Sequence, residues 1–267
     1  MATAAPVYEE RQMSIGRVFQ RAFSAISLNP LVILGLALVV GALPSLLMSY
    51  FFIASAAVST NPLQPGFSMN RIMGAAVLSG IISMVIAALV QGALTRATIA
   101  ANEGRRATFG ESLSSAVRVI LPLIGLSLLW AIGVGFGFVL LIVPGVILLL
   151  MWAVAVPALV VERDGTMAAF GRSAELTKGA RWKILGLFLV LLIGYWLLSI
   201  VVGLVGLKSL SATSGGVASL TITNLIGSIV LGTIFNTLWG TIQPSLYVEL
   251  RQWKEGDSVE NLEQIFA

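Results

Sequence analysis

The sequence predicts an all-α polytopic membrane protein: six transmembrane helices arranged as three hairpins, each preceded by an interfacial amphipathic helix. Charged residues make up 10% of the chain and hydrophobic residues 57%, whereas about a quarter of the residues in soluble domains are charged. The 43 residues from Val119 to Val161 include no Asp, Glu, Lys or Arg. That run is about twice the roughly 20 residues that cross a bilayer as a helix. The surrounding solvent must therefore be largely lipid.

Six apolar stretches form one predicted transmembrane domain (residues 12–256), between a polar N-terminal tail (1–11) and a cytoplasmic C-terminal tail (257–267). The predicted spans cover residues 31–57, 73–97, 119–137, 145–161, 184–206 and 220–246. The prolines expected to kink their spans are Pro44, Pro157 and Pro244.

The third and fourth spans need a turn between them. Gly133, Gly135 and Gly137, followed by Pro144-Gly145, are the helix breakers in that run, so they predict a tight hairpin. The spacing of Gly133 and Gly137 fits close helix approach equally well.

A short amphipathic stretch precedes the first, third and fifth spans. Apolar residues recur in each at helical spacing, opposite polar or charged ones. These positions are Ile15, Val18, Phe19, Ala22, Phe23 and Ile26; Phe109, Leu113, Ala116, Val117 and Ile120; and Met167, Phe170, Ala174 and Thr177. We expect these helices to lie in the headgroup plane. The recurrence predicts three similar units with approximate threefold symmetry; the alternative is that any protein with several spans needs interfacial linkers.

Lys and Arg are distributed unevenly between the two sides of the predicted membrane. Fourteen of the 16 basic residues and all 12 acidic residues fall on the side that holds both ends of the chain, and only Arg71 and Lys208 fall on the other. Because cytoplasmic loops carry the excess of Lys and Arg, both termini are predicted to be cytoplasmic. The polar N-terminal segment lacks the apolar core of a cleavable signal peptide, so the first span is expected to direct its own insertion.

The composition excludes several kinds of chemistry. The chain has no Cys and no His, so disulfides, thiolate chemistry, imidazole metal sites and His-based catalysis are excluded. No metal site and no cofactor are predicted. The basic residues form no dense run, so nucleic acid is not an expected partner. No carboxylate or amine lies near the centre of a span, which argues against a proton relay or an ion-coupled transporter.

Two groups of residues are candidate sites. One is a basic cluster that could bind anionic lipid headgroups; the alternative is ordinary charge that sets the topology. The other is a set of amides that could line a small pore; the alternative is hydrogen bonding between helices, in which Gln91 would also take part. The basic cluster comprises Arg172, Lys178, Arg181, Trp182 and Lys183, and the possible pore lining comprises Asn224, Asn236 and Gln243.

Three acidic residues lie near the predicted cytoplasmic boundary of the membrane, so we considered whether carboxylates there could catalyse a reaction. A carboxylate pair could act on lipid headgroups only if its members converged on one pocket. Without a His or a third ligand nearby, Glu162 and Asp164 are better explained as partners of Arg163 and Arg172. Glu249 is the third acidic residue that could take part in such a carboxylate pair. We therefore predict no catalytic residues and no enzymatic activity.

Several motifs resemble one bacterial family. They are Pro144-Gly145, Pro157, Glu162, Gly165, Arg172-Ser173-Ala174-Glu175-Leu176-Thr177-Lys178-Gly179, Gln243-Pro244, Tyr247, Leu250-Arg251 and Glu255-Gly256. In these residues the chain resembles the membrane-domain family attached to some bacterial glycerophosphodiester phosphodiesterases, and related stand-alone bacterial inner-membrane proteins of uncharacterised function. The resemblance covers most of the chain and implies a six-span, multi-pass module of the bacterial inner membrane. It does not imply the phosphodiesterase activity, which belongs to a separate soluble domain with catalytic His residues.

Taken together, the sequence favours a membrane module without catalytic activity: a scaffold, an accessory subunit or a lipid-contacting protein. Its expected partners are anionic membrane lipids and another membrane protein. The alternative is a passive channel or facilitator for a small solute or lipid-like molecule.

Overall fold

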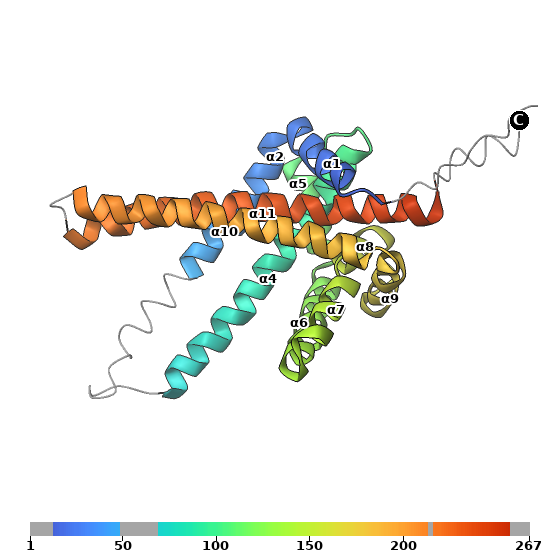
Figure 1. The fold of residues 1–267 in the computed structure, drawn as a ribbon, viewed down its shortest axis with the longest axis horizontal. Helices are drawn as coiled ribbons and strands as arrows, with labels where there is room; N and C mark the ends of the chain where they lie inside the picture. The colour runs from blue at the N-terminus through green and yellow to red at the C-terminus, as the bar shows by residue number, and fades with distance from the viewer. Residues whose placement is uncertain (1–12, 49–68, 213–215, 257–267) are drawn as a thin grey trace, which may run out of the picture.

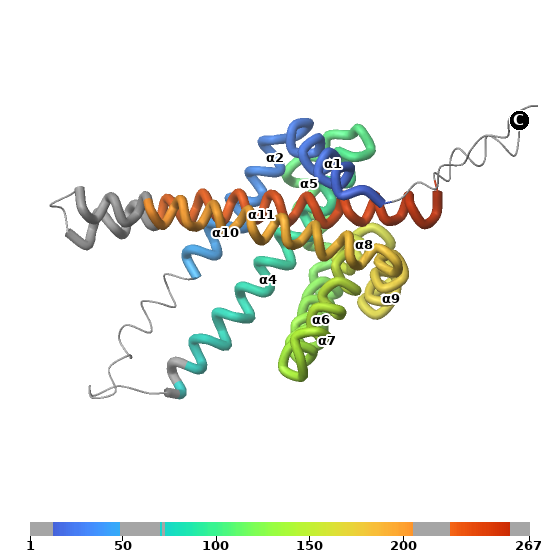
Figure 2. The backbone as a smooth tube through the Cα atoms, in the orientation of Figure 1, coloured from blue at the N-terminus to red at the C-terminus, as the bar shows by residue number. Residues whose placement is uncertain are grey.

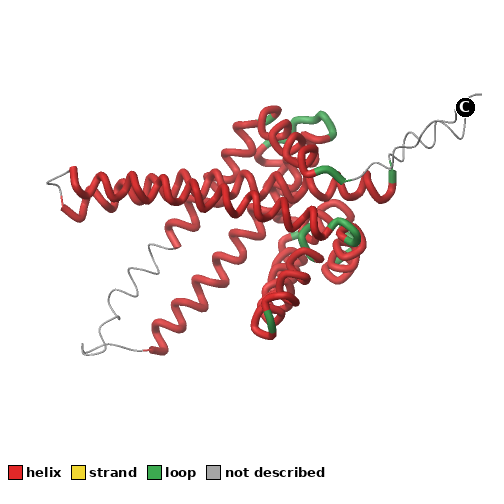
Figure 3. The backbone as a smooth tube through the Cα atoms, in the orientation of Figure 1, coloured by secondary structure: helices red, strands yellow, loops and turns green. Residues whose placement is uncertain are grey.

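The computed structural model describes residues 13–48, 69–212 and 216–256, without the side chains of 69, 71–72, 205–212 and 216–224. These residues form helices and no strands (Figures 1 and 3). Within them, six helical segments are long and apolar enough to cross a membrane, which agrees with the predicted all-α membrane fold. They are Pro30–Met48, Met73–Asn102, Ile120–Leu140, Ile142–Glu162, Arg181–Leu204 and Leu225–Glu255. The predicted end of the first span, near residue 57, lies outside the described residues.

The helices follow one another with short connections. The N-terminal part contains α1 (Ile15–Leu28), α2 (Pro30–Gly35), the π-helix η1 (Leu36–Ala42) and α4 (Met69–Asn102). The central part contains α5 (Phe109–Arg118), α6 (Ile120–Leu140), α7 (Ile142–Met151), α8 (Ala155–Glu162) and α9 (Thr166–Thr177). Two long helices follow, α10 (Arg181–Ala212) and α11 (Gly216–Glu255). Helices α1, α5 and α9 lie at the three amphipathic stretches of the sequence.

The long helices diverge from a common base. Helices α10 and α11 lie side by side along the longest axis, whereas α4 and the pair α6–α7 extend in other directions (Figures 1 and 2). Helices α1, α5, α8 and α9 gather where the long helices meet (Figure 1). We call this base, with the last turns of α11, the charged end, because the ionised side chains of the described residues concentrate there.

Burial is concentrated at the charged end. In α4 no side chain among the described residues 73–87 is buried, whereas most of those from Ala88 to Ala101 are. Helix α11 repeats this pattern, with no buried side chain in 225–236 and many from Thr237 to Leu250. Apolar side chains cover the exposed halves. The described residues therefore pack most tightly at the charged end, whereas the far halves of the long helices present apolar surface to their surroundings.

The turn between the third and fourth spans falls later than the sequence suggests. Helix α6 continues to Leu140, and Leu141 alone, in extended conformation, separates it from α7. The glycines in 133–137 therefore lie inside α6, and the prediction that they form the turn is wrong. A Cβ added to Gly137 would lie 2.9 Å from the Cα of Gly145. At this position glycine is needed for close approach of α6 and α7, which was the alternative interpretation.

The fourth span is interrupted in its middle. Helix α7 ends at Met151 and α8 begins at Ala155, so the predicted continuous span 145–161 is two helices. Pro157 lies in the first turn of α8, where the missing N–H of proline costs little. The prediction of a kink in this span is correct in kind, but the interruption precedes the proline.

Two side-chain hydroxyls of α9 form hydrogen bonds with backbone groups at the break between α7 and α8. The Ser173 hydroxyl accepts a hydrogen bond from the Val154 N–H (3.2 Å) and donates one to the Met151 carbonyl (2.9 Å). The Thr177 hydroxyl also donates to that carbonyl, at 3.3 Å. Backbone groups released from a helix inside a membrane need such partners. Helix α9 therefore supports the break between α7 and α8.

Thr108 begins α5 with a capping box. Its hydroxyl accepts from the Glu111 N–H (3.2 Å), and the Glu111 carboxylate accepts from the Thr108 N–H (2.8 Å). The hydrogen bond from the Thr108 backbone lowers the pKa of Glu111. We expect Thr108→Ala to lower the melting temperature in detergent by about 2–4 °C. Thr108→Ser should retain the native value, and equal values for both variants would contradict the cap.

Candidate functional site

The last turns of α11 carry two groups of charged residues, one toward α1 and one toward α8 and α9. The first group centres on Glu249, whose side chain is 3% exposed. Its Oε1 accepts hydrogen bonds from Arg17 Nε (2.8 Å) and from the Ser14 N–H (3.2 Å). Arg21 lies 3.5 Å from the other carboxylate oxygen and also donates to Gln252. A carboxylate buried in this way depends on its cationic partners, so Glu249 fixes α1 on α11.

The second group centres on Arg172 of α9. Its Nε donates to Glu162 at 2.8 Å, and a terminal nitrogen pairs with Glu255. Tyr247 donates its hydroxyl to the same Glu162 oxygen at 2.6 Å, and Arg251 pairs with Glu255 at 3.0 Å. Burial alone would lower the pKa of Arg172, but the hydrogen bonds to Glu162 and Glu255 outweigh it and raise that pKa. The predicted pairing of Glu162 with Arg172 is confirmed, and it joins α8, α9 and α11. The predicted pairing of Asp164 with these arginines is wrong, because neither Asp164 nor Arg163 forms an ion pair with the described residues.

The contacts of Arg172 with two carboxylates give a direct prediction. A lysine ammonium cannot reproduce the planar arrangement with which arginine binds two carboxylates. We therefore expect Arg172→Lys to lower the free energy of unfolding by about 1–2 kcal/mol, roughly one charged hydrogen bond. Thermal unfolding in detergent measures this, with Lys178→Arg on the exposed surface as the control. A melting temperature equal to that of the control would contradict the bridging role.

The structure does not gather the predicted basic cluster into one site. Arg172 is directed into the acidic group just described. Lys178 is exposed, and Trp182 is 85% exposed. Arg181 is half-buried, and its Nε has no hydrogen-bond partner in the described part of the chain. Lys183 donates to a main-chain carbonyl just before α1, at 3.1 Å.

Among the described residues of the charged end, basic side chains outnumber carboxylates. Every glutamate that the structure describes takes part in an ion pair or a hydrogen bond. Several cations, by contrast, form no ion pair with a carboxylate of residues 13–48, 69–212 or 216–256. We call five of them the basic rim: Arg106, Arg118, Arg163, Lys178 and Arg181.

Of the predicted lining amides, Asn236 and Gln243 have described side chains, and each contacts a neighbouring helix. Gln91 of α4 donates to Gln243 of α11 at 2.5 Å, which confirms hydrogen bonding between helices for this pair. Asn236 faces the π-helix, because a Cβ added to Gly41 would lie 2.9 Å from its Nδ2. The side chain of Asn224 lies outside the described residues. In the described segments, no three acidic side chains are placed to hold a metal ion.

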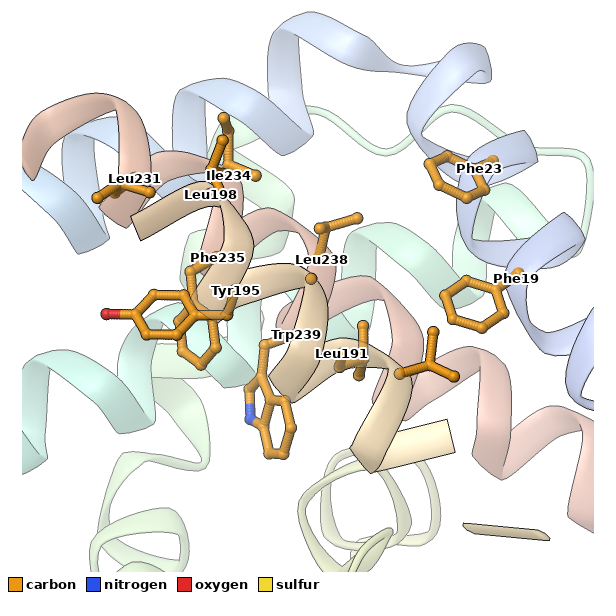
Figure 4. A pocket seen from close by; sticks show the side chains of 12 residues that line it. Phe19, Phe23, Leu191, Tyr195, Leu198, Leu231, Ile234, Phe235, Leu238 and Trp239 are labelled. Atoms are coloured by element: carbon orange, nitrogen blue, oxygen red, sulfur yellow. The ribbon is translucent and has the colours of Figure 1, made fainter. Parts of the chain in front are cut away.

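A pocket of about 200 Å³ opens between α1, α10 and α11 (Figure 4). Its walls are apolar, apart from one tyrosine hydroxyl and one indole N–H. Residues that line it include Phe19 and Phe23 from α1, Leu191 and Tyr195 from α10, and Phe235 and Trp239 from α11.

Aromatic contacts hold the two walls of this pocket together. The Phe235 ring lies 5.0 Å from that of Tyr195 and 6.0 Å from that of Trp239, between centroids. Trp239 also contacts Phe188 of α10, at 5.2 Å. Such pairs stabilise packing beyond the area they bury. Sequence reasoning missed this pocket, although Phe235 and Trp239 stand four residues apart on one face of a helix.

Comparison with known proteins identifies a family for this chain. One family model, described as Domain of unknown function (DUF7847), matches residues 13–250. No curated protein and no solved structure matches the chain. The match agrees with the expected uncharacterised family, whereas the resemblance to phosphodiesterase membrane domains stays a prediction. Because the matched region runs from before α1 to the last turns of α11, the chain belongs to the family Domain of unknown function (DUF7847).

Proposed function

We propose that the protein is a membrane module without catalytic activity that binds anionic lipids at its charged end and serves as a scaffold or accessory subunit. The basic rim carries this proposal, because its five cations form no ion pairs with the described carboxylates. Each Lys or Arg beside an anionic membrane surface contributes about 1 kcal/mol to binding. A rim of this size therefore supports binding of anionic headgroups.

In this proposal α1, α5 and α9 lie in the headgroup layer, and each precedes one of three hairpins. The burial of α1 supports this placement, since Val18 and Ala22 are buried whereas Gln20 and Ser24 are exposed. Trp182, at the start of α10, is of a residue type enriched at membrane interfaces. Its 85% exposure suits an interfacial anchor.

We further infer that the charged end faces the cytoplasm and that the membrane is the bacterial inner membrane. The distribution of Lys and Arg supports the orientation, since 14 of the 16 fall on that side by the predicted topology. Both chain termini would then be cytoplasmic. The family resemblance noted in the sequence supports the choice of membrane.

The surroundings of the acidic residues support a non-catalytic role. Glu162 and Glu249 accept hydrogen bonds from arginines, and Asp164 is exposed. Glu162 and Glu249 belong to separate ion-paired groups on either side of α11. A catalytic carboxylate pair would instead converge on one pocket.

The motif residues themselves favour a shared architecture with the phosphodiesterase membrane domains. Arg172 joins three helices, and Ser173 and Thr177 satisfy the break between α7 and α8. Gly179 has a φ of 88°, a conformation that favours glycine. These roles are structural, so the proposed relationship concerns the membrane scaffold and not the phosphodiesterase reaction.

Lipid retention tests the proposal. The full chain would be reconstituted with equal phosphatidylglycerol and phosphatidylcholine, and its bound lipids counted by native mass spectrometry. We expect phosphatidylglycerol to be retained selectively. Neutralising Arg118, Arg163 and Lys178 together with glutamine should weaken its retention at least about tenfold, since each charge contributes about 1 kcal/mol.

Arg105→Gln is the matched control, because Arg105 already pairs with Glu103 at 2.6 Å. Unselective binding by the native chain would contradict the proposal, as would an equal loss in control and triple variant.

A passive channel is the second candidate. The hydroxyls of Thr95, Thr98 and Thr237 are buried without a partner in the described chain, on the two helices that the Gln91–Gln243 hydrogen bond joins. Buried polar groups of this kind are uncommon and could border a polar path. Solute flux into liposomes that falls with Asn236→Leu or Gln243→Leu, while the fold stays intact, would favour the channel. Unchanged flux would exclude it.

A further inference from the structure

We propose that the pocket between α1, α10 and α11 holds one acyl chain of an anionic phospholipid, with the phosphate bound by Arg181. This inference rests on the proposed function, because it requires the pocket to open into a bilayer at the charged end. It adds a defined site and a defined lipid class to general contact with anionic headgroups.

The rim of the pocket is open. Phe23 is 55% exposed, Val190 54% and Phe235 41%, so a flexible chain can enter from the side. Among the side chains that line the pocket, Tyr195 and Trp239 are the two that carry a polar group. Ordered water needs two to four polar partners, so such a wall suits hydrocarbon better than water.

The position of the pocket suits a lipid of the leaflet at the charged end. Val190 follows Arg181 by nine residues, about 14 Å along the axis of α10. Half of a hydrocarbon core is about 15 Å thick. Phe19 and Phe23 of α1 line one side of the pocket (Figure 4). A lipid whose headgroup lies beside α1 would therefore place its acyl chain against this wall.

Arg181 supplies the complementary charge. It forms no ion pair with the described residues, and its Nε is shielded from solvent without a hydrogen-bond partner. It precedes Phe188 by 7 and Tyr195 by 14 residues, so the three lie on one face of the helix. Phe188 contacts Trp239 of the pocket wall. In this proposal the guanidinium binds the phosphate, and the apolar pocket farther along α10 holds the acyl chain.

Gly194 allows the pocket to be filled without disturbing the fold. It lines the pocket, and a Cβ added there meets no atom within 4 Å. Gly203 on the same helix is equally open but does not line the pocket. Gly194→Phe and Gly203→Phe therefore form a matched pair of variants. The new ring occupies the proposed lipid site in Gly194→Phe and lies outside it in Gly203→Phe.

The experiment uses the full chain in nanodiscs that contain phosphatidylglycerol with a photoreactive group in its acyl chain. Cross-linked positions are then mapped by mass spectrometry. We expect cross-links concentrated on residues 190–198 and 231–239. Gly194→Phe should reduce their yield about tenfold, the effect of displacing roughly two buried methylene groups, and Gly203→Phe should leave it unchanged. Arg181→Gln should reduce the preference over phosphatidylcholine with the same photoreactive chain.

Two outcomes would overturn the inference: cross-links spread evenly over the exposed faces of α4 and α10, or pocket cross-links unaffected by Gly194→Phe. If native mass spectrometry finds no selective retention of phosphatidylglycerol at all, the proposed function fails. If the lipid is retained but Gly194→Phe has no effect, the acyl-chain site alone fails.

Discussion

Replacing Glu249 by alanine is expected to release α1 from α11 and to lower the free energy of unfolding by about 2–3 kcal/mol. Removing one partner of a fully buried ion pair costs roughly 3–5 kcal/mol. We expect a smaller loss of stability for Glu249→Ala, because Arg17 is 40% exposed and regains part of its hydration. The loss is still large, since Arg21 and the Ser14 N–H lose the same acceptor. Thermal unfolding in detergent, with limited proteolysis near α1, measures both effects.

Glu103→Ala is the matched control for this variant. Its pair with Arg105 is exposed on both sides, and such surface pairs contribute about 0–1 kcal/mol. If Glu249→Ala melted at the temperature of the control and left α1 protected from protease, Glu249 would not be the anchor of α1.

Gly240→Leu should have the other large effect, because α4 and α11 touch at this glycine. A Cβ added there would overlap the side chain of Leu94, whose own Cβ would lie only 2.9 Å away. Overpacking a dense core costs about 1–3 kcal/mol, occasionally more. We expect the upper end of that range, because both helices are buried at this level. We expect Gly240→Leu to lower the melting temperature and to broaden the elution peak in size-exclusion chromatography.

Gly80→Leu in α4 controls for the added side chain, since nothing lies within 4 Å of the new Cβ. It should keep the native melting temperature. An unchanged melting temperature for Gly240→Leu would mean that the two helices do not pack at this glycine.

The features that sequence patterns predicted well are those set by local composition. The uninterrupted apolar stretches predict helices long enough to span a membrane, because length and hydropathy are properties of each segment alone. The periodic apolar positions around Val18, Ala116 and Phe170 coincide with α1, α5 and α9 for the same reason. The Glu162–Arg172 pair was also predictable, since the two residues are close in sequence and opposite in charge.

The features that the sequence did not predict depend on contacts between distant segments. Gly137 reads as a turn residue, yet it serves close packing against Gly145, and glycine suits either purpose. The break after Met151 is tolerated because Ser173 supplies hydrogen bonds from another helix.

The candidate sites, too, depend on contacts between segments that are far apart in the sequence. Charge alone grouped Arg172 with Lys178, but the fold directs Arg172 toward Glu255, 83 positions further along the chain. The apolar pocket combines α1 with the last two helices. Phe19 and Trp239 are far apart in sequence, so no local pattern joins them.

The most direct test of the account is the membrane topology of the charged end. The chain has no cysteine, so single cysteines at Arg105, Lys178 and Asn70 can each be labelled with an impermeant maleimide in intact cells and in inverted membrane vesicles. We expect the cysteines at Arg105 and Lys178 to react only in inverted vesicles and the one at Asn70 only in intact cells. Labelling of Arg105 and Lys178 from opposite sides would contradict the account.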